Sequence, residues 1–270
     1  MPMYGGGASF REISYLFVDM GCFRECLKRL SLRYFNDPLA LVCDHSFFRS
    51  TASKVFFYDA VPAKENGEDH TAYNQRIDQR MAEVGKLRLL DGCHVQLGDL
   101  RGKKAAQKKV DVMIAVDMLM HTFRRNMDNC TLLTGDSDFQ PLLEALNREG
   151  MFTTLWHPAQ APADLMGAAD SVRPLNLQTL GGGLRRAPGV PLLPAFNADI
   201  RPRLDKTDLA DTVIDGRVYL LSENQRGYLI EHFDPKASAT SHHAQDKDRN
   251  ILVKAAEDIW GIELPKDFFS

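Results

Sequence analysis

The 270-residue sequence lacks several features that would assign a protein to a class at once. It has no CxxC pair, and its five cysteines are an odd number, so neither a disulfide scaffold nor a zinc finger is predicted. Free thiols in a reducing compartment are the better interpretation. No apolar run approaches the ~18–20 residues of a membrane-spanning helix, and the N-terminal residues lack the pattern of a secretion signal. We therefore expect a cytoplasmic protein without a membrane partner.

The sequence also lacks a strong net charge. Its 33 basic and 36 acidic residues give −3, so no overall field attracts nucleic acid, and any such binding must rely on local basic patches. With 44% hydrophobic and 26% charged residues, the composition is that of an ordinary globular protein. The length allows one large domain or two smaller ones.

Strand and helix patterns alternate through the first two thirds of the chain. Short apolar runs predict strands at 13–19, 54–60, 93–97, 130–135 and 151–156. Helical spacing of apolar residues predicts helices at 21–30, 71–90, 110–123 and 136–150. This alternation predicts an α/β domain with a mainly parallel sheet.

The composition changes after this region. Residues 179–206 are rich in glycine and proline and predict a linker or an extended arm. Residues 207–270 contain a predicted strand at 216–221 and a predicted helix at 249–261, which indicate a small α+β region. The expected organisation is an N-terminal arm (1–12), an α/β domain (13–178), the linker (179–206) and the C-terminal region (207–270).

Carboxylates gather where the predicted strands end. Asp19 and Asp59 each stand at or near the end of an apolar strand, and Asp136 follows the strand at 130–135. Asp111 opens the helix at 110–123, from which it can reach the same edge of the sheet. Ligands of open parallel sheets bind at this edge. Converging carboxylates repel one another unless a cation lies among them, and oxygen ligands suit Mg²⁺ or Mn²⁺.

The motifs KKVDVMIAVDMLMHTF and LLTGDSDFQPLLEALNREG, with YLFVDMGCF and KVFFYDA before them, resemble the NYN domain, a PIN-like nuclease domain of LabA-type proteins. The resemblance covers residues 13–178 and implies a three-layer, PIN-like fold. It implies a metal-dependent ribonuclease, with the acidic positions at Asp19, Asp111, Asp136 and Asp138. The first three are the expected ligands of Mg²⁺ or Mn²⁺. The family commonly has an asparagine where this sequence has Cys22, and a thiol is a poorer partner for a hard cation.

Simpler roles stay open for these residues. Asp19 could merely end a strand, and Asp111, Asp136 and Asp138 could merely occupy helix starts, where acids are favoured. Three further residues are expected to have supporting roles. Asp117 lies roughly 120° around the helix from Asp111, so both are not expected to reach one ion. The other two supporting candidates are Asp59 and Thr134.

A basic run precedes Asp111. Such runs are usually solvated loops, but beside a phosphodiester-cleaving site this one is equally suited to contact phosphates. Its members are Arg101, Lys103, Lys104, Lys108 and Lys109.

The expected function is a metal-dependent endoribonuclease acting on single-stranded or structured RNA, with water as the nucleophile; a homo-oligomer is allowed. One alternative is a HAD-like phosphatase, but its chemistry needs an acid where this sequence has Gly21. The serious alternative is a catalytically inactive NYN-like module that binds RNA or protein, and Cys22 is the residue that favours it.

Overall fold

The computed structural model describes residues 12–98, 103–188, 190–191, 197–200, 205–236 and 240–269. It divides into two compact units. Unit 1 comprises residues 1–23 and 45–173, and unit 2 comprises residues 24–44 and 174–270. The boundary falls inside helix α1 (Met20–Phe35).

Unit 1 is built on a six-stranded sheet with the order β4-β3-β1-β5-β6-β7. Its four pairs from β4 to β6 are parallel, which confirms the predicted mainly parallel sheet. The strands are β1 (Ser14–Asp19), β3 (Lys54–Ala60), β4 (Cys93–Gly98), β5 (Asn129–Leu133), β6 (Phe152–His157) and β7 (Ser171–Pro174).

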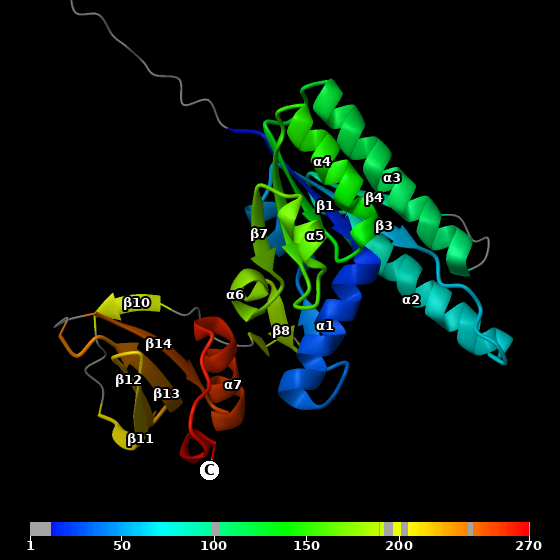
Figure 1. Ribbon diagram of the computed structural model, residues 1–270. Helices are drawn as coiled ribbons and strands as arrows, with labels where there is room; N and C mark the ends of the chain where they lie inside the picture. The colour runs from blue at the N-terminus through cyan, green and yellow to red at the C-terminus, as the bar shows by residue number, and fades with distance from the viewer. Residues whose placement is uncertain are drawn as a thin grey trace, which may run out of the picture. The chain divides into compact units, whose positions relative to one another are not determined.

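Helices cover both faces of this sheet, so unit 1 has the three layers expected of the fold (Figure 1). One face carries α3 (Lys103–Phe123) and α4 (Gln140–Arg148), and a short turn, η2 (Ser137–Phe139), precedes α4. The opposite face carries the start of α1, η1 (His45–Ser50) and α2 (His70–Arg88). The short helix α5 (Ala163–Gly167) follows β6.

The alternation of side chains along β1 explains how the two cores form. Phe17 points to the face of α3 and α4, where it belongs to the core that includes Ile114 and Leu143. On the opposite face, Phe48 of η1 packs edge-on against Phe57 of β3. Both faces are buried, which is why the strands are nearly continuous apolar runs.

Helix α3 differs from the sequence prediction. The sequence predicted a solvated stretch at 101–109 and a helix from 110, whereas the helix begins at Lys103. Alanine, glutamine and lysine are good helix formers, so the stretch AAQKK extends the helix toward its N-terminus without adding apolar periodicity. The apolar pattern therefore marked the helix only from Val110 onward.

Unit 2 contains two antiparallel sheets. The larger one has the order β10-β14-β13-β12-β11, and α7 (Arg249–Trp260) packs on it. Its strands are β10 (Asn197–Ile200), β11 (Thr207–Ile214), β12 (Arg217–Asn224), β13 (Gly227–Phe233) and β14 (Thr240–Asp246). The predicted strand at 216–221 and helix at 249–261 correspond to β12 and α7.

The smaller sheet joins segments that are distant in sequence: β2 (Leu41–Cys43), β8 (Leu184–Arg186) and β9 (Val190–Pro191). The other short elements of unit 2 are α6 (Leu177–Leu180) and η3 (Lys266–Phe268). The stretch 179–206, for which the sequence predicted a linker or an extended arm, contains β8, β9 and β10. Among the described residues, no helix is long and apolar enough to cross a membrane.

Candidate active site at the carboxyl end of the parallel sheet

The chain reverses the direction in which it adds strands between β1 and β5. From β1 it builds outward through β3 to β4, and then α3 leads back to β5 on the other side of β1. The connections that leave β1 and β5 therefore diverge at this point, where open α/β sheets bind their ligands. Asp19 ends β1, and Thr134 and Asp136 follow β5.

Asp19 is fixed by three hydrogen bonds. Its Oδ1 atom accepts hydrogen bonds from the backbone N–H groups of Gly21 (2.9 Å) and Cys22 (3.1 Å) in the first turn of α1. Its Oδ2 atom accepts one from Thr134 Oγ1 at 3.2 Å. Burial raises the pKa of Asp19, the three hydrogen bonds oppose that rise, and the nearby charge of Asp136 adds to it. The strand-ending aspartate is thus also the cap of a helix.

Thr134 connects the two strand ends. Its side chain is buried, and its Oγ1 atom also accepts a hydrogen bond from the backbone N–H of Asp136 at 3.3 Å. The backbone N–H of Thr134 donates to Trp156 O, which continues the pairing of β5 with β6. Thr134 therefore holds Asp19 and the Asp136 backbone in a fixed relation.

Asp136 and Asp138 lie in the turn that begins η2. Asp136 Oδ1 accepts a hydrogen bond from the backbone N–H of Asp138 at 2.9 Å, so Asp136 caps this turn. Capping is one of the simpler roles that the sequence left open for this residue. Only one of its carboxylate oxygens is used in that contact. Asp136 is half-buried and Asp138 is exposed, which leaves both carboxylates accessible to a ligand.

Asp111 of α3 completes the group. Burial first, and then the negative charges of Asp19, Asp136 and Asp138 in that order, together raise the pKa of Asp111 to about 6. The structure thus brings Asp19, Asp136 and Asp138 near enough for their charges to act on Asp111, and Asp136 near enough to act on Asp19. No lysine, arginine or histidine among the described residues lies within ion-pair distance of any of them.

A divalent cation fits the chemistry of this group, because its carboxylates offer hard oxygen donors and a negative charge that no described cation pairs with. The distances between the acids fit a bound ion less well. Within the part of the chain that the structure describes, no group of three or more histidine, cysteine or acidic side chains stands close enough together to hold a metal ion. An ion bound here would therefore have to draw the carboxylates inward.

Two of the predicted supporting acids lie elsewhere. Asp117 accepts a hydrogen bond from Tyr58 Oη at 2.7 Å, which turns its carboxylate toward β3. Asp59 is buried and forms an ion pair with Arg80 of α2 at 2.9 Å. Because neighbouring side chains of a strand alternate, Asp59 points to the face opposite that of Asp19. Neither acid contributes to the charge that acts on Asp111.

The basic run is described only in part. Arg101 lies outside the described residues, and so do the side chains of Lys103, Lys104 and Lys108, whose backbone forms the start of α3. Lys109 is exposed on the same helix, two residues before Asp111. Phosphate contacts by this run stay a prediction.

Several residues at the site escaped the sequence analysis. A Cβ atom on Gly135 would lie 2.5 Å from Pro158 Cγ, so only glycine fits between the two strand ends. That same position is 3.7 Å from Cys22 Sγ, which places the thiol beside the connection after β5. Gly135 belongs to the GDSD motif, but its need to be glycine could not be predicted, because Pro158, the residue that crowds it, is distant in the sequence.

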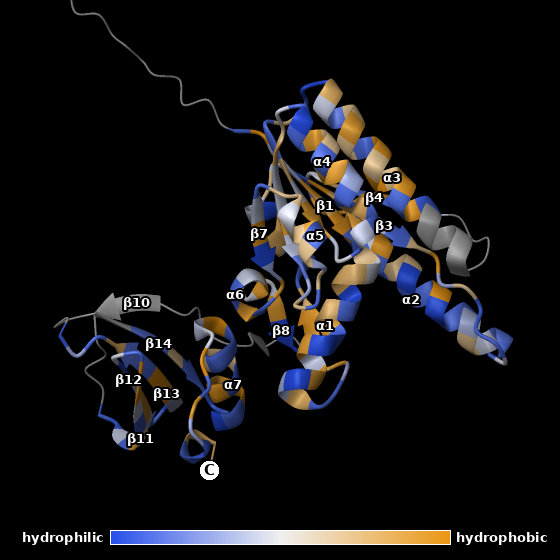
Figure 2. Cartoon of the chain, viewed as in Figure 1, coloured by the Kyte–Doolittle hydropathy of each residue, from blue (hydrophilic) through white to orange (hydrophobic). Residues whose placement is uncertain are grey.

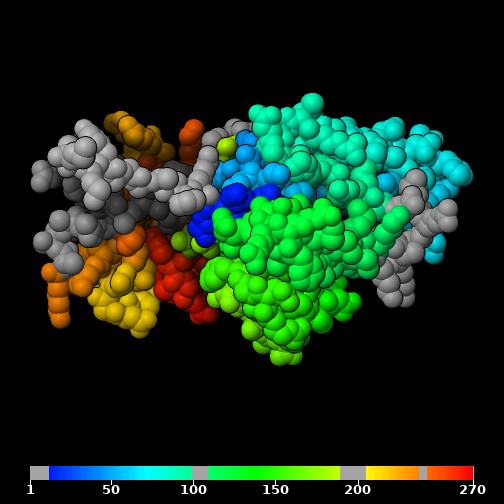
Figure 3. All heavy atoms as spheres, turned by 90° about the horizontal axis from the view of Figure 1, so that it is seen from above, coloured from blue at the N-terminus to red at the C-terminus, as the bar shows by residue number. Residues whose placement is uncertain are grey.

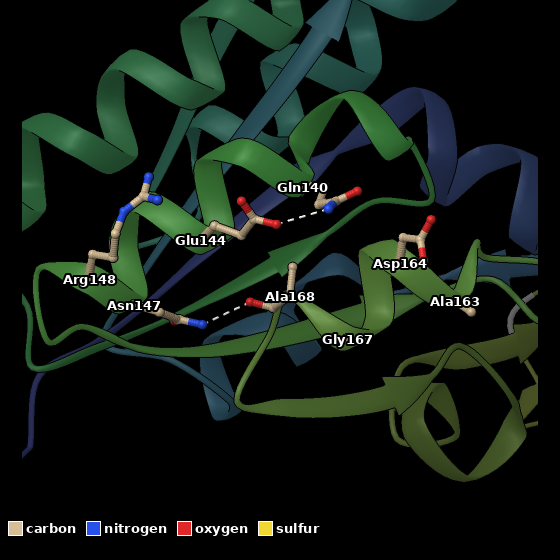
Figure 4. A pocket seen from close by; sticks show the side chains of 8 residues that line it. All are labelled: Gln140, Glu144, Asn147, Arg148, Ala163, Asp164, Gly167 and Ala168. Carbon is tan, nitrogen blue, oxygen red and sulfur yellow. Dashed lines mark hydrogen bonds between the residues drawn. The ribbon is translucent and has the colours of Figure 1, made fainter.

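A separate shallow hollow lies between α4 and α5, with a volume of about 530 Å³ (Figure 4). Gln140 and Glu144 are hydrogen-bonded along one wall, and the amide of Asn147 donates to Ala168 O. It begins just after the Asp136–Asp138 turn, but none of the four acids lines it.

The family model of the NYN domain matches residues 19–176 of this chain. The chain belongs to the NYN domain family. NYN proteins are generally nucleases, so membership supports a nuclease-type function related to RNA. It gives no support to a phosphatase. Members of this family typically use divalent metal ions.

Other comparisons add little to this assignment. No curated protein matches the chain. A crystal structure of a protein of unknown function from Vibrio parahaemolyticus is similar at 17% identity and a TM-score of 0.43, over 63% of this chain and 96% of that one. A likeness of this size supports no inference about function.

Proposed function

We propose that this NYN protein is an endoribonuclease that cleaves RNA with the help of Mg²⁺ or Mn²⁺. The observation that carries the proposal is the gathering of Asp19, Asp136 and Asp138 near Asp111 at the point where β1 and β5 end, close enough for their charges to act on Asp111. Such a concentration of like charge destabilises the folded chain unless a cation relieves it. A site selected only for stability would not collect four acids here.

Asp19, Asp111 and Asp136 are the proposed ligands, and Asp138 is the proposed fourth acid of the site. The bound ion would polarise the scissile phosphate and lower the pKa of the water that attacks it. The chain itself orients the Asp19 carboxylate, because Thr134 and the start of α1 hold it by three hydrogen bonds. A single-stranded or structured RNA would approach over Lys109 and the start of α3.

The test is cleavage of end-labelled RNA, and of DNA with the same sequence, in Mg²⁺, in Mn²⁺ and in EDTA. We expect internal cuts in RNA with either ion and none in EDTA. Asp19→Asn should abolish cleavage while the fold is kept, because an amide oxygen can still cap α1. Asp78→Asn is a matched control, since Asp78 is an exposed acid on α2, on the opposite face of the sheet.

The second candidate function is an inactive module that binds RNA or protein. Two observations favour it: the absence of a tight three-ligand group among the described residues, and the position of Cys22 beside Gly135. Titration with Mn²⁺, followed by calorimetry, separates the two functions. The nuclease should bind the ion with an affinity that Asp19→Asn reduces at least about tenfold, and the inactive module should bind none.

A further inference from the structure

Helix α3 is apolar on two faces. Its inner face packs on the sheet through Val110, Ile114 and Met118, which are at most 5% exposed. Its outer face carries four apolar side chains that no described residue covers: Val112 (61% exposed), Val116 (51%), Met120 (40%) and Phe123 (62%). We call these four residues the α3 outer face.

Helix α3 is orange along much of its length in Figure 2. Seen from above, the green atoms of α3 and α4 lie at the surface of unit 1 (Figure 3). A helix that is apolar all round is normally buried, and contiguous apolar patches on a protein surface mark interaction sites.

The spacing of this face specifies a helical partner. Val112, Val116 and Phe123 of this face, together with the half-buried Leu119, follow one another at intervals of four, three and four residues, and Met120 lies beside this line. This is the seam of a coiled coil, in which apolar residues repeat every 3.5 residues on average. Leu119 is half-buried because part of its side chain packs against the core of unit 1.

The same spacing is unchanged when the helix is read in reverse. In an antiparallel pair, Val112 would therefore face Phe123 of a second copy, and Val116 would face Leu119 of that copy. Each contact combines a smaller side chain with a larger one, which is how well-packed interfaces interdigitate. A surface that complements itself about a two-fold axis is the basis of the commonest oligomers.

The charges at the two ends favour the antiparallel direction. Lys109 lies in line with the seam, one turn before Val112, and is exposed. Reversal brings it opposite Asn126 of the second copy, near Asp128, which is also exposed. A parallel pair would instead set Lys109 against its equivalent, and like charges in contact disfavour association.

We propose that the α3 outer face is covered by the same face of a second copy of this chain, with the two helices antiparallel. The face offers on the order of 400 Å², about half of the ~800 Å² per partner in a standard interface. The dimer is therefore weak and depends on concentration. This proposal is independent of the proposed nuclease activity.

Sedimentation equilibrium of the full chain, from low to high micromolar concentration, tests the dimer. The parent mass should rise from one chain toward two. Val116→Glu should weaken dimerisation at least ~100-fold, because the pair would bury two unpaired carboxylates. Val213→Glu is the matched control, because Val213 is 62% exposed on β11 in unit 2, and it should dimerise like the parent.

Oxidative cross-linking tests the direction of the helices. The double variant Val112→Cys, Phe123→Cys should form a covalent dimer, whereas Val112→Cys alone should not. In an antiparallel pair the two copies of residue 112 are ~16 Å apart along the helices, beyond the ~7 Å that a disulfide spans between Cα atoms. The parent, with its own five cysteines, gives the background.

Three results would overturn the proposal. A monomer at every concentration would leave this face to a different protein. A dimer that tolerates Val116→Glu would place the interface elsewhere. Efficient cross-linking by Val112→Cys alone would exclude the antiparallel arrangement. Circular dichroism spectra like that of the parent would establish that each variant is folded.

Discussion

Replacement of Asp111 by asparagine should stabilise the protein when no metal is present. The pKa of Asp111 rises from the ordinary 3.8 to about 6 in the folded chain, through burial first and then through the charges of the three other acids. At 1.36 kcal/mol per pH unit this difference corresponds to at most ~3 kcal/mol of destabilisation at neutral pH. Asp111 is only half-buried, so solvent screening reduces the expected gain to about 1 kcal/mol.

The pH dependence follows from the sign of the pKa change. Between about pH 4 and pH 6 the folded state keeps the Asp111 proton that the unfolded state has released. Stability is therefore lost as the pH rises through this window, and the loss is complete above it. Asparagine does not titrate, so the advantage of Asp111→Asn should be absent near pH 4 and fully present at pH 7.

Thermal unfolding in EDTA measures the effect. A gain of 1 kcal/mol raises Tm by about 2–4 °C for a domain of this size, and Asp78→Asn should give no comparable rise. Added Mg²⁺ should reverse the order, since a ligand at 100 times its Kd stabilises the parent by about 2.7 kcal/mol and the variant by less. The reasoning fails if Asp111→Asn lowers Tm in EDTA at pH 7, or raises it equally at pH 4.

Three further predictions concern the same region. Asp136→Asn should fold with nearly unchanged Tm, because asparagine caps as well as aspartate; it should bind RNA like the parent but cleave it orders of magnitude more slowly, and retained cleavage would exclude Asp136 as a ligand. Exchange of the four lysines of the basic run for glutamine should flatten the salt dependence of RNA binding by roughly 0.7 per lost contact; an unchanged slope would assign them to a solvated surface. Gly135→Ala should cost about 1–3 kcal/mol in urea unfolding, because its Cβ atom would lie 2.5 Å from Pro158 Cγ; Gly167→Ala, with nothing within 4 Å, should not destabilise.

The sequence was sufficient for the features that depend on near neighbours in the chain. The buried runs that became β1, β3 and β5 were readable because a strand covered on both faces leaves a continuous apolar segment. The acids could be predicted because Asp19 and Asp59 stand at or near the ends of their strands and Asp136 comes three residues after β5. Even the capping role of Asp136 was anticipated, since it depends on a residue only two positions away.

Only the tertiary structure decided which of these acids act together. Asp59 and Asp19 both stand near strand ends, but the alternation of side chains turns Asp59 to the opposite face, where Arg80 neutralises it. The contact of Thr134 with Asp19 required β5 to lie beside β1, and a pairing of segments 115 residues apart depends on chain topology. The antiparallel pairing of β2 with β8 in unit 2 could not be predicted for the same reason. Local sequence carries propensity and capping, whereas contacts between distant segments depend on how the whole chain buries its apolar surface.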